Sequence, residues 1–418
     1  MIHRLHNPVR PYAWGSRTHI AGLTSREFGD QPVAEMWIGA HPSAPSRLGD
    51  DQGERLDDVI AAAPARTLGS YAQALHGDRL PYLLKLLAAS EPLSLQVHPE
   101  AERAQRGFNA QEAAGMATDA WDRSYPDPSH KPELLHALTR FEGLAGFRDT
   151  GKTAAILRGL RLPWLDRDAG FLDNHHDAEQ AVSELVTGWM SLPEDDVKRL
   201  LADVGAAAMS AEQRAHSAAR PHRPTAMDAA EIARESVRVF AATAALVERY
   251  PTDPGVLVTL LLNHVVLAPG ESMFIEAGVV HAYTAGFGIE IMASSDNVLR
   301  AGLTRKHVDV PELLAAASFQ PIPPPRYVGT RVGADTVLAP PVAEFELHLL
   351  DLDGSAVTLG HPAPRVVLCL RDKVELSAGG EGLTLDQGEA AFVEAISGEL
   401  TLCGPGRAVV AQTPVAAR

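Results

Sequence analysis

The clearest pattern of apolar and polar residues lies in the middle of the chain and is helical. In AVSELVTGWM, Val182, Val186 and Trp189 recur at intervals of three or four residues, so they fall on one face of a helix. A second Ala-rich stretch, AAEIARESVRVFAATAALVERY, has the same character and ends before Pro251, which cannot continue a helix. We therefore predict a helical domain over residues 151–254.

On both sides of this block, short apolar runs alternate with Gly, Pro and Asp, which is typical of β-strands and turns. Two runs repeat: residues 267–277 (LAPGESMFIEA) and 385–395 (LDQGEAAFVEA) share Leu, Gly-Glu, Phe and Glu-Ala at the same offsets. A Gly-Glu turn between short apolar strands suits an antiparallel jelly roll. We predict two related β-barrels, joined by the Pro-rich linker FQPIPPPRY.

The predicted fold is thus mainly β, with two antiparallel jelly-roll barrels and a helical insertion. We expect the first barrel to use residues 1–150 and 255–320, and the second to use residues 321–418. The repeat copies differ in one way: His281 lies four residues after the first copy, whereas Glu399 takes that place after the second. Only the first barrel is therefore expected to hold a metal site.

Composition and charge exclude some classes of function. The 418 residues are 45% hydrophobic and carry a formal charge of -16, which argues against binding to nucleic acid or an anionic membrane. A small anionic substrate needs only a local cationic pocket. The two cysteines form no redox or metal motif, and neither a signal peptide nor a membrane span is recognisable. We expect a cytoplasmic protein, and a monomer because no interface pattern is legible.

Three segments offer metal ligands. In LSLQVHPE, Gln96 and His98 alternate with apolar residues, so they share one face of a strand. SHKPELLHAL supplies Glu133 between two further histidines, and VVHAY supplies His281. Two imidazoles, a carboxylate and an oxygen donor suit a divalent ion, with zinc as the first choice. The alternative is that these are surface or hydrogen-bonded residues on the polar face of a strand.

Other polar residues stand out by their surroundings. Arg300 and Lys306, in DNVLRAGLTRKHVDV, could bind a phosphate or lie in a solvated loop. Lys85 stands among leucines, which indicates either a pocket residue or a surface lysine with a buried stem. Glu290 lies in a strand that is apolar on both faces and is therefore expected to be buried. A buried carboxylate needs either an ion-pair partner or a functional role. Tyr283 shares the face of a strand with the preceding histidine and could donate a hydrogen bond or simply pack.

Four stretches of the chain resemble type I mannose-6-phosphate isomerase. In chain order they are AEMWIGAHPSAPS, LPYLLKLLAASEPLSLQVHPE, HKPELLHAL and GVVHAYTAGFGIEIMASSDNVLRAGLTRKHVDV. The resemblance implies a zinc enzyme of the cupin superfamily with two cupin-like barrels. It implies the interconversion of mannose 6-phosphate and fructose 6-phosphate, in GDP-mannose biosynthesis. It implies one zinc ion per chain, bound by Gln96, His98, Glu133 and His281. For substrate binding, it implies Ser94, Lys85, Tyr283 and Lys306.

Moving a carbonyl between C1 and C2 of a sugar requires the removal of a carbon-bound proton and the stabilisation of an enediolate. Zinc would polarise the substrate oxygens, and Arg300 would stabilise charge on the substrate. Glu290 is the predicted base because burial raises the pKa of a carboxyl group towards neutrality. Lys131 and a water molecule on the zinc stay open as alternatives. The reaction needs neither a nicotinamide nor a flavin.

Two other functions stay open. A non-haem iron oxygenase uses two histidines and a carboxylate on a similar barrel, and consumption of oxygen would reveal it. A sugar-binding cupin without catalytic activity could keep the barrel and lose the metal. The Gln96 donor and the cationic segment from Arg300 to Lys306 favour the isomerase.

Overall fold

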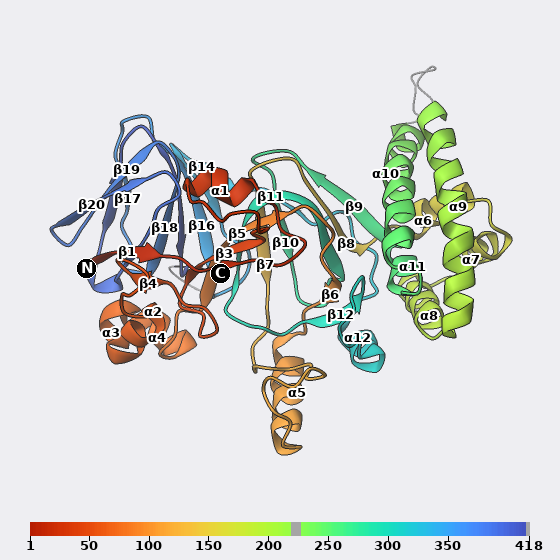
Figure 1. Ribbon diagram of the computed structural model, residues 1–418, viewed down its shortest axis with the longest axis horizontal. Coiled ribbons are helices and arrows are strands. Elements are labelled where there is room, and N and C mark those ends of the chain that lie inside the picture. The colour runs from red at the N-terminus through yellow and green to blue at the C-terminus, as the bar shows by residue number, and fades with distance from the viewer. Residues whose placement is uncertain (219–226, 415–418) are drawn as a thin grey trace.

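The structure, a computed structural model, describes residues 1–218 and 227–414. Its parts form a row: a sheet rich in carboxyl-terminal strands at one end, a central sheet, and a helical block at the other end (Figure 1). The named strand pairs are all antiparallel. The predicted mixture of antiparallel sheets and helices is therefore confirmed.

The central sheet has eleven strands and carries most of the predicted site residues. Its main path runs through β13 (Arg326–Tyr327), β10 (Ser272–Ile275), β7 (Glu133–Ala137), β11 (His281–Ala293), β5 (Tyr82–Ala89), β3 (Glu35–Gly39) and β2 (Val9–Arg10). A branch adds β6 (Leu95–Val97), β12 (Leu299–Gly302), β8 (Phe141–Phe147) and β9 (Leu262–Leu267).

Strand β11 joins the two halves of the central sheet. Its first residues pair with β6 and β8, whereas its residues from Gly286 onwards pair with β5 and β7. The register with β8 shifts just after Tyr283, and Gly286 has a φ of 129°. A Cβ at Gly286 would lie 2.7 Å from the backbone of Phe141, so a glycine is needed there. One bulged strand thus carries His281 in the first half and Glu290 in the second.

The amino-terminal strand β1 (Ile2–His6) lies in the eight-stranded sheet of the carboxyl-terminal residues. Its Ile2 stands opposite Val393 of β21, and β4 (Arg47–Leu48) pairs with its other edge. The prediction that residues 1–150 belong to the first barrel is therefore wrong for β1 and β4, because β1 supplies the backbone partner that the edge of β21 needs. The rest of the predicted domain division stays a prediction.

The remaining strands of the eight-stranded sheet are β14 (Thr330–Val332), β15 (Asp335–Leu338), β16 (Glu346–Asp351), β23 (Arg407–Gln412), β18 (Arg365–Arg371) and β21 (Ala390–Val393). A third sheet contains β17 (Val357–Leu359), β22 (Leu400–Cys403), β19 (Lys373–Ala378) and β20 (Glu381–Asp386). Short helices flank the sheets: α1 (His19–Thr24), α2 (Leu56–Ala62), α3 (Pro64–Thr67), α4 (Gly69–His76), α5 (Ala101–Ala113), α12 (Val310–Ala316) and the 3₁₀ turn Ala395–Ser397.

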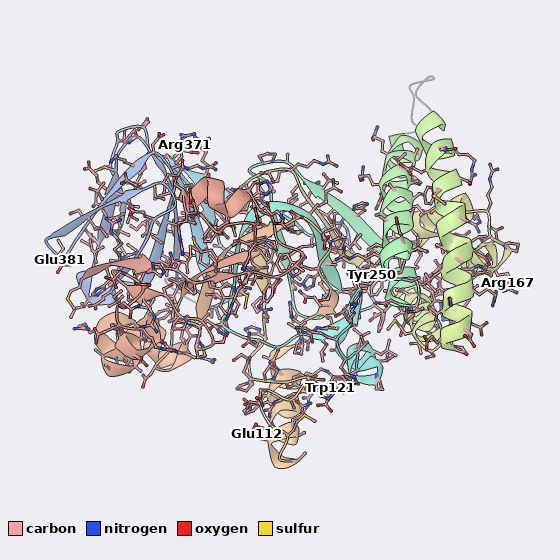
Figure 2. The ribbon with its side chains drawn as sticks, viewed as in Figure 1. Glu112, Trp121, Arg167, Tyr250, Arg371 and Glu381 are labelled. Carbon is pink, nitrogen blue, oxygen red and sulfur yellow. The ribbon has the colours of Figure 1, made fainter. Side chains whose placement is uncertain are left out.

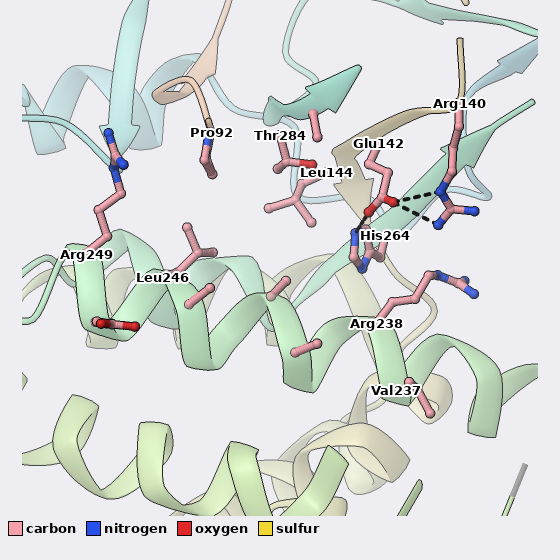
Figure 3. Close-up of a pocket in the computed structure, with 15 residues that line it drawn as sticks. Pro92, Arg140, Glu142, Leu144, Val237, Arg238, Leu246, Arg249, His264 and Thr284 are labelled. Carbon is pink, nitrogen blue, oxygen red and sulfur yellow. Dashed lines mark hydrogen bonds and ion pairs between the residues drawn. The ribbon is translucent and has the colours of Figure 1, made fainter. Parts of the chain in front are cut away.

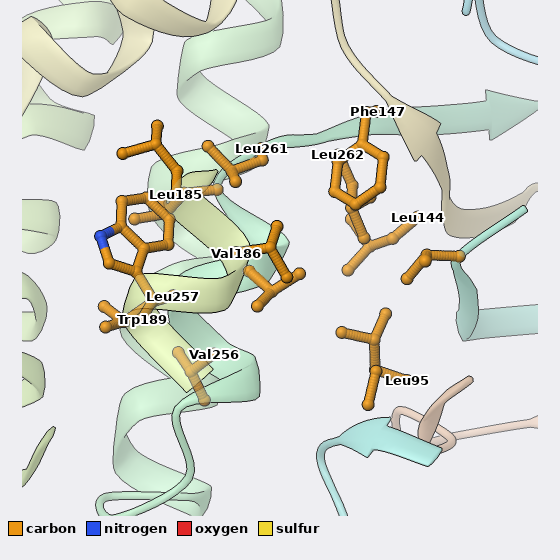
Figure 4. Close-up of a cluster of buried hydrophobic side chains, with 14 of the residues drawn as sticks. Leu95, Leu144, Phe147, Leu185, Val186, Trp189, Val256, Leu257, Leu261 and Leu262 are labelled. Atoms are coloured by element: carbon orange, nitrogen blue, oxygen red, sulfur yellow. The ribbon is translucent and has the colours of Figure 1, made fainter. Parts of the chain in front are cut away.

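The predicted helical stretches are confirmed, and the helices begin soon after β8. They are α6 (Thr150–Gly159), α7 (Pro163–Asn174), α8 (Ala178–Met190), α9 (Glu194–Ala218), α10 (Met227–Arg249) and α11 (Gly255–Thr259). Trp189 of α8 and Leu257 of α11 share one hydrophobic core with Leu95 and Leu144 of the central sheet (Figure 4). The block is therefore packed onto the strands that carry the site. Within the described residues, none of these helices has the length and apolar character needed to span a bilayer.

Both copies of the repeat form the predicted turn between two strands. Gly270 and Gly388 adopt φ values of 91° and 82°, which a side chain would disfavour. In each copy the glutamate after the glycine accepts a hydrogen bond from the backbone N–H three residues earlier, at 2.7 Å for Glu271 and 2.8 Å for Glu389. The shared Gly-Glu pair is thus explained by one turn geometry used twice.

His348 is buried in the eight-stranded sheet between two carboxylates. Its Nδ1 lies 2.7 Å from Asp335 Oδ2, and its Nε2 lies 3.3 Å from Glu346 Oε1 and 3.2 Å from the amide nitrogen of Gln412. Burial alone would lower the pKa of His348, but the two carboxylates raise it to about 9. The imidazole is therefore protonated in the folded protein at neutral pH.

We expect this contact to make stability depend on pH. The contribution of protonated His348 is complete below the ordinary pKa of 6.5 and is lost as the pH rises through about 9. The free energy of unfolding should fall over that range by on the order of 3 kcal/mol. Urea unfolding across the range measures it, and His348→Gln should lack the decline. An equal decline in both proteins would contradict this explanation.

Candidate active site

Three buried side chains meet where the two halves of the central sheet join. His98 follows β6, Glu133 opens β7 and His281 opens β11. Glu133 Oε1 lies 3.0 Å from His98 Nε2, and Glu133 Oε2 lies 3.5 Å from His281 Nε2. One ligand atom from each residue lies within 4.8 Å of the other two. The sequence-predicted residues therefore form one compact His–Glu–His cluster.

Each imidazole of the cluster is oriented by its other ring nitrogen. Nδ1 of His98 donates to the carbonyl of Asn297 at 2.8 Å, and Nδ1 of His281 donates to the carbonyl of Val279 at 2.9 Å. With Nδ1 bound in this way, Nε2 of each ring faces Glu133. Nε2 of His98 is buried and forms no hydrogen bond with any described residue. Two imidazole nitrogens and a carboxylate that converge within 4.8 Å of one another form a donor set that fits zinc.

Gln96 lies beside this cluster, where the family resemblance implied a further ligand. Its amide nitrogen is 3.2 Å from His281 Nε2, and in the strand register Gln96 stands opposite His281 on one side and Arg300 on the other. Directly opposed residues of neighbouring strands share a face. A half-turn of the amide would direct its oxygen at the cluster, and oxygen is the donor that a divalent ion requires.

Two further polar side chains hold the Glu133 carboxylate. The Lys131 ammonium lies 3.2 Å from Oε1, and the Tyr283 hydroxyl donates to Oε2 at 3.2 Å. Burial alone would raise the pKa of Glu133, but His98 and Lys131 hold it well below its ordinary value. Burial and the neighbouring Glu133 raise the pKa of Tyr283, so this phenol stays protonated. Glu133 is therefore ionised and fixed in place.

A second buried charge network lies on the neighbouring strands β11, β5 and β3. The Lys85 ammonium lies 3.1 Å from Glu290 Oε2 and 3.6 Å from Glu35 Oε1. Lys85 is only 6% exposed, which excludes the surface alternative, and Glu35 and Glu290 raise its pKa although burial opposes this. Burial raises the pKa of Glu290 despite the attraction of Lys85. Glu290 therefore has the ion-pair partner that its burial demands, and its catalytic role stays a proposal.

A cationic cavity of about 650 Å³ lies beside the strands of the cluster. Ser94, Arg300 and Lys306, to which the family resemblance assigns substrate contact, line it together. Ser94 precedes Gln96 by two residues, and Arg300 stands opposite Gln96, so the cavity adjoins the cluster. Burial lowers the pKa of Arg300, and burial and Arg300 lower the pKa of Lys306. Unbalanced positive charge of this kind favours an anionic ligand.

Some residues of this cavity had no predicted role. Trp14, Arg305 and Arg249 also line it. Arg305 directly precedes Lys306 in the basic segment, so its charge was visible in the sequence, although a solvated loop was the favoured interpretation. Arg249 comes from α10 of the helical block, where the pattern of apolar residues predicts a helix but says nothing of which residue reaches the sheet.

Comparison with known proteins agrees with this geometry. Residues 2–150 match the family described as phosphomannose isomerase type I, catalytic domain. Over its full length the chain is similar to mannose-6-phosphate isomerase of Escherichia coli, with 36% identity over 413 residues that cover 97% of this chain and 98% of the relative. It is also 31% identical to the human mannose-6-phosphate isomerase over 367 residues, covering 83% and 81%.

Solved structures extend the likeness to the fold. One is mannose 6-phosphate isomerase from Salmonella typhimurium bound to its substrate, fructose 6-phosphate, and zinc, and another is a mannose 6-phosphate isomerase bound with zinc and yttrium. Each has a TM-score of 0.85 and 33% identity, and the match covers 99% of this chain and 100% of the solved one. The fold and site thus define an isomerase. The chain belongs to the type I mannose-6-phosphate isomerase family, as its motifs predicted.

Proposed function

We propose that the chain is a zinc-dependent aldose–ketose isomerase that interconverts mannose 6-phosphate and fructose 6-phosphate. The observation that carries the proposal is the buried cluster of His98, Glu133 and His281 beside a cavity lined by Arg300 and Lys306. The solved relative that is bound to fructose 6-phosphate and zinc supports both the substrate and the metal. An oxygenase or a metal-free sugar-binding protein is not favoured, because the family relatives are isomerases.

Four residues would hold the ion: Gln96, His98, Glu133 and His281. When bound, zinc supplies a Lewis acid that polarises the carbonyl and hydroxyl oxygens of an open-chain sugar. The hydrogen bonds to the carbonyls of Asn297 and Val279 keep both imidazoles in the ligating orientation. The Tyr283 hydroxyl holds Glu133 in the orientation that faces both rings.

The substrate would be oriented by its phosphate. Arg300 and Lys306 supply the positive charge, and Ser94 supplies a hydroxyl close to the Gln96 side of the cluster. Arg300 stands nearest to the metal residues through its pairing with Gln96, so it would also stabilise charge on the reacting carbons. In this arrangement the phosphate would lie in the cavity, and the C1 and C2 atoms would point towards the cluster.

Glu290 is the proposed base. In the direction from mannose 6-phosphate, its carboxylate would remove the proton from C2, which turns the C1 carbonyl into the O1 oxygen of an enediolate. The proton of the O2 hydroxyl would then pass to O1, and Glu290 would return its proton to C1, which leaves the carbonyl at C2. Lys85, 3.1 Å away, would balance its charge while it is ionised. Lys131 stays the alternative base, since its ammonium lies 3.2 Å from Glu133 at the edge of the cluster.

Finer features of the predicted architecture are proposed on the same basis. The central and carboxyl-terminal sheets would be two cupin-like jelly-roll barrels, of which the second lacks a metal site. The ranges 151–254, 255–320 and 321–418 would be the helical insertion, the rest of the catalytic barrel and the second barrel. A cytoplasmic monomer with a role in GDP-mannose biosynthesis fits this function.

Removal and return of the metal tests the proposed function. We expect a chelator to lower the conversion of mannose 6-phosphate to fructose 6-phosphate at least roughly a hundredfold, because the substrate oxygens lose their Lewis acid. Stoichiometric zinc should restore it, with one ion bound per chain. If the zinc-loaded protein binds the ion but does not isomerise the sugar phosphate, the function is wrong. Iron-dependent consumption of oxygen would instead support the oxygenase.

A further inference from the structure

The helical block contributes a cation to the substrate cavity. Arg249, the last residue of α10, lines the same cavity as Arg300 and Lys306. It also lines a neighbouring cavity of about 690 Å³ between α10 and the sheet, where Arg238 lies (Figure 3). Figure 3 shows Arg249 leaving the helix on the side of Pro92, which lies two residues before Ser94. Arg249 thus stands at the point where the two cavities meet.

Contacts on both sides hold this arginine in place. An Nη2–H of Arg249 donates to Glu91 Oε2 at 2.5 Å, and its Nε–H donates to the Tyr250 hydroxyl at 3.2 Å. Glu91 lies in the segment between β5 and β6, on the central sheet side. A guanidinium has five N–H donors, so these two bonds leave three donors for a ligand. The side chain is therefore oriented and still able to bind.

The backbone around Arg249 is also tied to the basic segment. Asp253 accepts hydrogen bonds from the backbone N–H of Gly255 at 2.8 Å and of Thr304 at 3.3 Å. Thr304 lies in the same cavity and directly precedes Arg305. The shared hydrophobic core of Figure 4 continues from the helices to Leu95, which follows Ser94. Figure 2 shows Tyr250 at this junction of the helical block and the sheet. Packing therefore fixes the distance between α10 and the cavity.

The positive charges that line the cavity favour a ligand with two negative charges. Four of its lining residues are cations, and among the described residues that line it there is no carboxylate. The four cationic residues are Arg249, Arg300, Arg305 and Lys306. Glu91 offsets part of one charge at the edge of the cavity. The remaining positive charge matches a phosphate dianion, which accepts several charge-assisted hydrogen bonds at once.

We propose that Arg249 is a phosphate-binding residue which the helical block supplies to the substrate site, and that Glu91 positions it. The inference rests on the proposed function, since it assigns one further residue to the phosphate of the same substrate. It also assigns a role to the helical block: this block completes the part of the site that distinguishes a sugar phosphate from the free sugar.

Arg249→Gln tests the assignment in the zinc-loaded, full-length protein. The KM for mannose 6-phosphate should rise roughly tenfold to a hundredfold, because a charge-assisted hydrogen bond is lost in the ground state and the transition state alike. For the same reason kcat should change little. The inhibition constant of inorganic phosphate, used as a competitive inhibitor, should rise by a similar factor. Arg249→Lys keeps the charge and should recover part of the affinity.

Two matched variants separate binding from a merely structural role. Arg238→Gln makes the same change on the same helix in the neighbouring cavity, so KM and phosphate inhibition should stay at the wild-type level. Glu91→Gln frees the arginine from its anchor and should raise KM less than Arg249→Gln does. Unchanged KM and phosphate inhibition in Arg249→Gln would overturn the inference, as would an equal loss in Arg238→Gln. An inactive wild-type protein would instead refute the proposed function itself.

Discussion

Replacing Glu133 with glutamine is expected to lower zinc affinity by roughly a hundredfold or more and to remove most isomerase activity. The carboxylate faces Nε2 of both His98 and His281, and glutamine has almost the same shape but no negative charge. Without that charge, the ion keeps only a neutral amide donor at this position, and the Lys131 ammonium loses its anionic partner at 3.2 Å. Metal content after dialysis, together with turnover as a function of added zinc, measures the effect.

A second substitution on β7 serves as the control. His136 lies on the same strand, bonds to the Ser272 hydroxyl at 2.9 Å and is not part of the cluster. His136→Gln should therefore keep both zinc and activity if it folds, which a thermal melt checks. If Glu133→Gln retained stoichiometric zinc at wild-type affinity, the assignment of Glu133 as a ligand would be wrong.

Glu290→Gln is expected to reduce kcat roughly 10² to 10⁴-fold, while zinc content and KM stay close to wild type. The amide preserves the shape of the side chain beside Lys85 but cannot accept a proton from carbon. Burial raises the pKa of Glu290, and the base acts only when it is ionised. Activity of the wild type should therefore fall with decreasing pH at a value above the ordinary carboxyl pKa of 4.5. Steady-state kinetics across pH measures both effects.

Glu35 offers a matched carboxylate, because it contacts Lys85 from the other side at 3.6 Å. Glu35→Gln removes the same charge from the same lysine, so it should reduce kcat far less than Glu290→Gln does. Equal losses would indicate that the charge balance of Lys85 matters more than a base at Glu290. If Glu290→Gln remained active and Lys131→Met did not, Lys131 would be the base.

The parts of the site that could be predicted from the sequence depend on short-range rules. Gln96 and His98 are two residues apart in one strand, and strand alternation alone places them on one face. The Gly-Glu turns followed from a repeat whose geometry is local. That this pair lies close to Glu133 and His281 was expected only from the family resemblance. The pairing of strands far apart in the chain cannot be read from the residues of any one strand.

Arg249 and β1 show where sequence reasoning stops. The apolar face of α10 predicts a helix, but the contact of its last residue with Glu91 depends on how the block packs onto the sheet. The strand-like run Ile2–His6 is equally compatible with either sheet. Its partner is decided by which strand edge is free in the folded chain, and no residue within β1 carries that information.

The position of β1 between β21 and β4 also sets an order of events during synthesis. Ile2 is synthesised almost four hundred residues before its partner Val393. At about 5–20 residues per second, the strand waits for tens of seconds with an unpaired edge. The eight-stranded sheet can therefore close only after β21 has been made, so the folding of β1 is delayed until most of the chain exists.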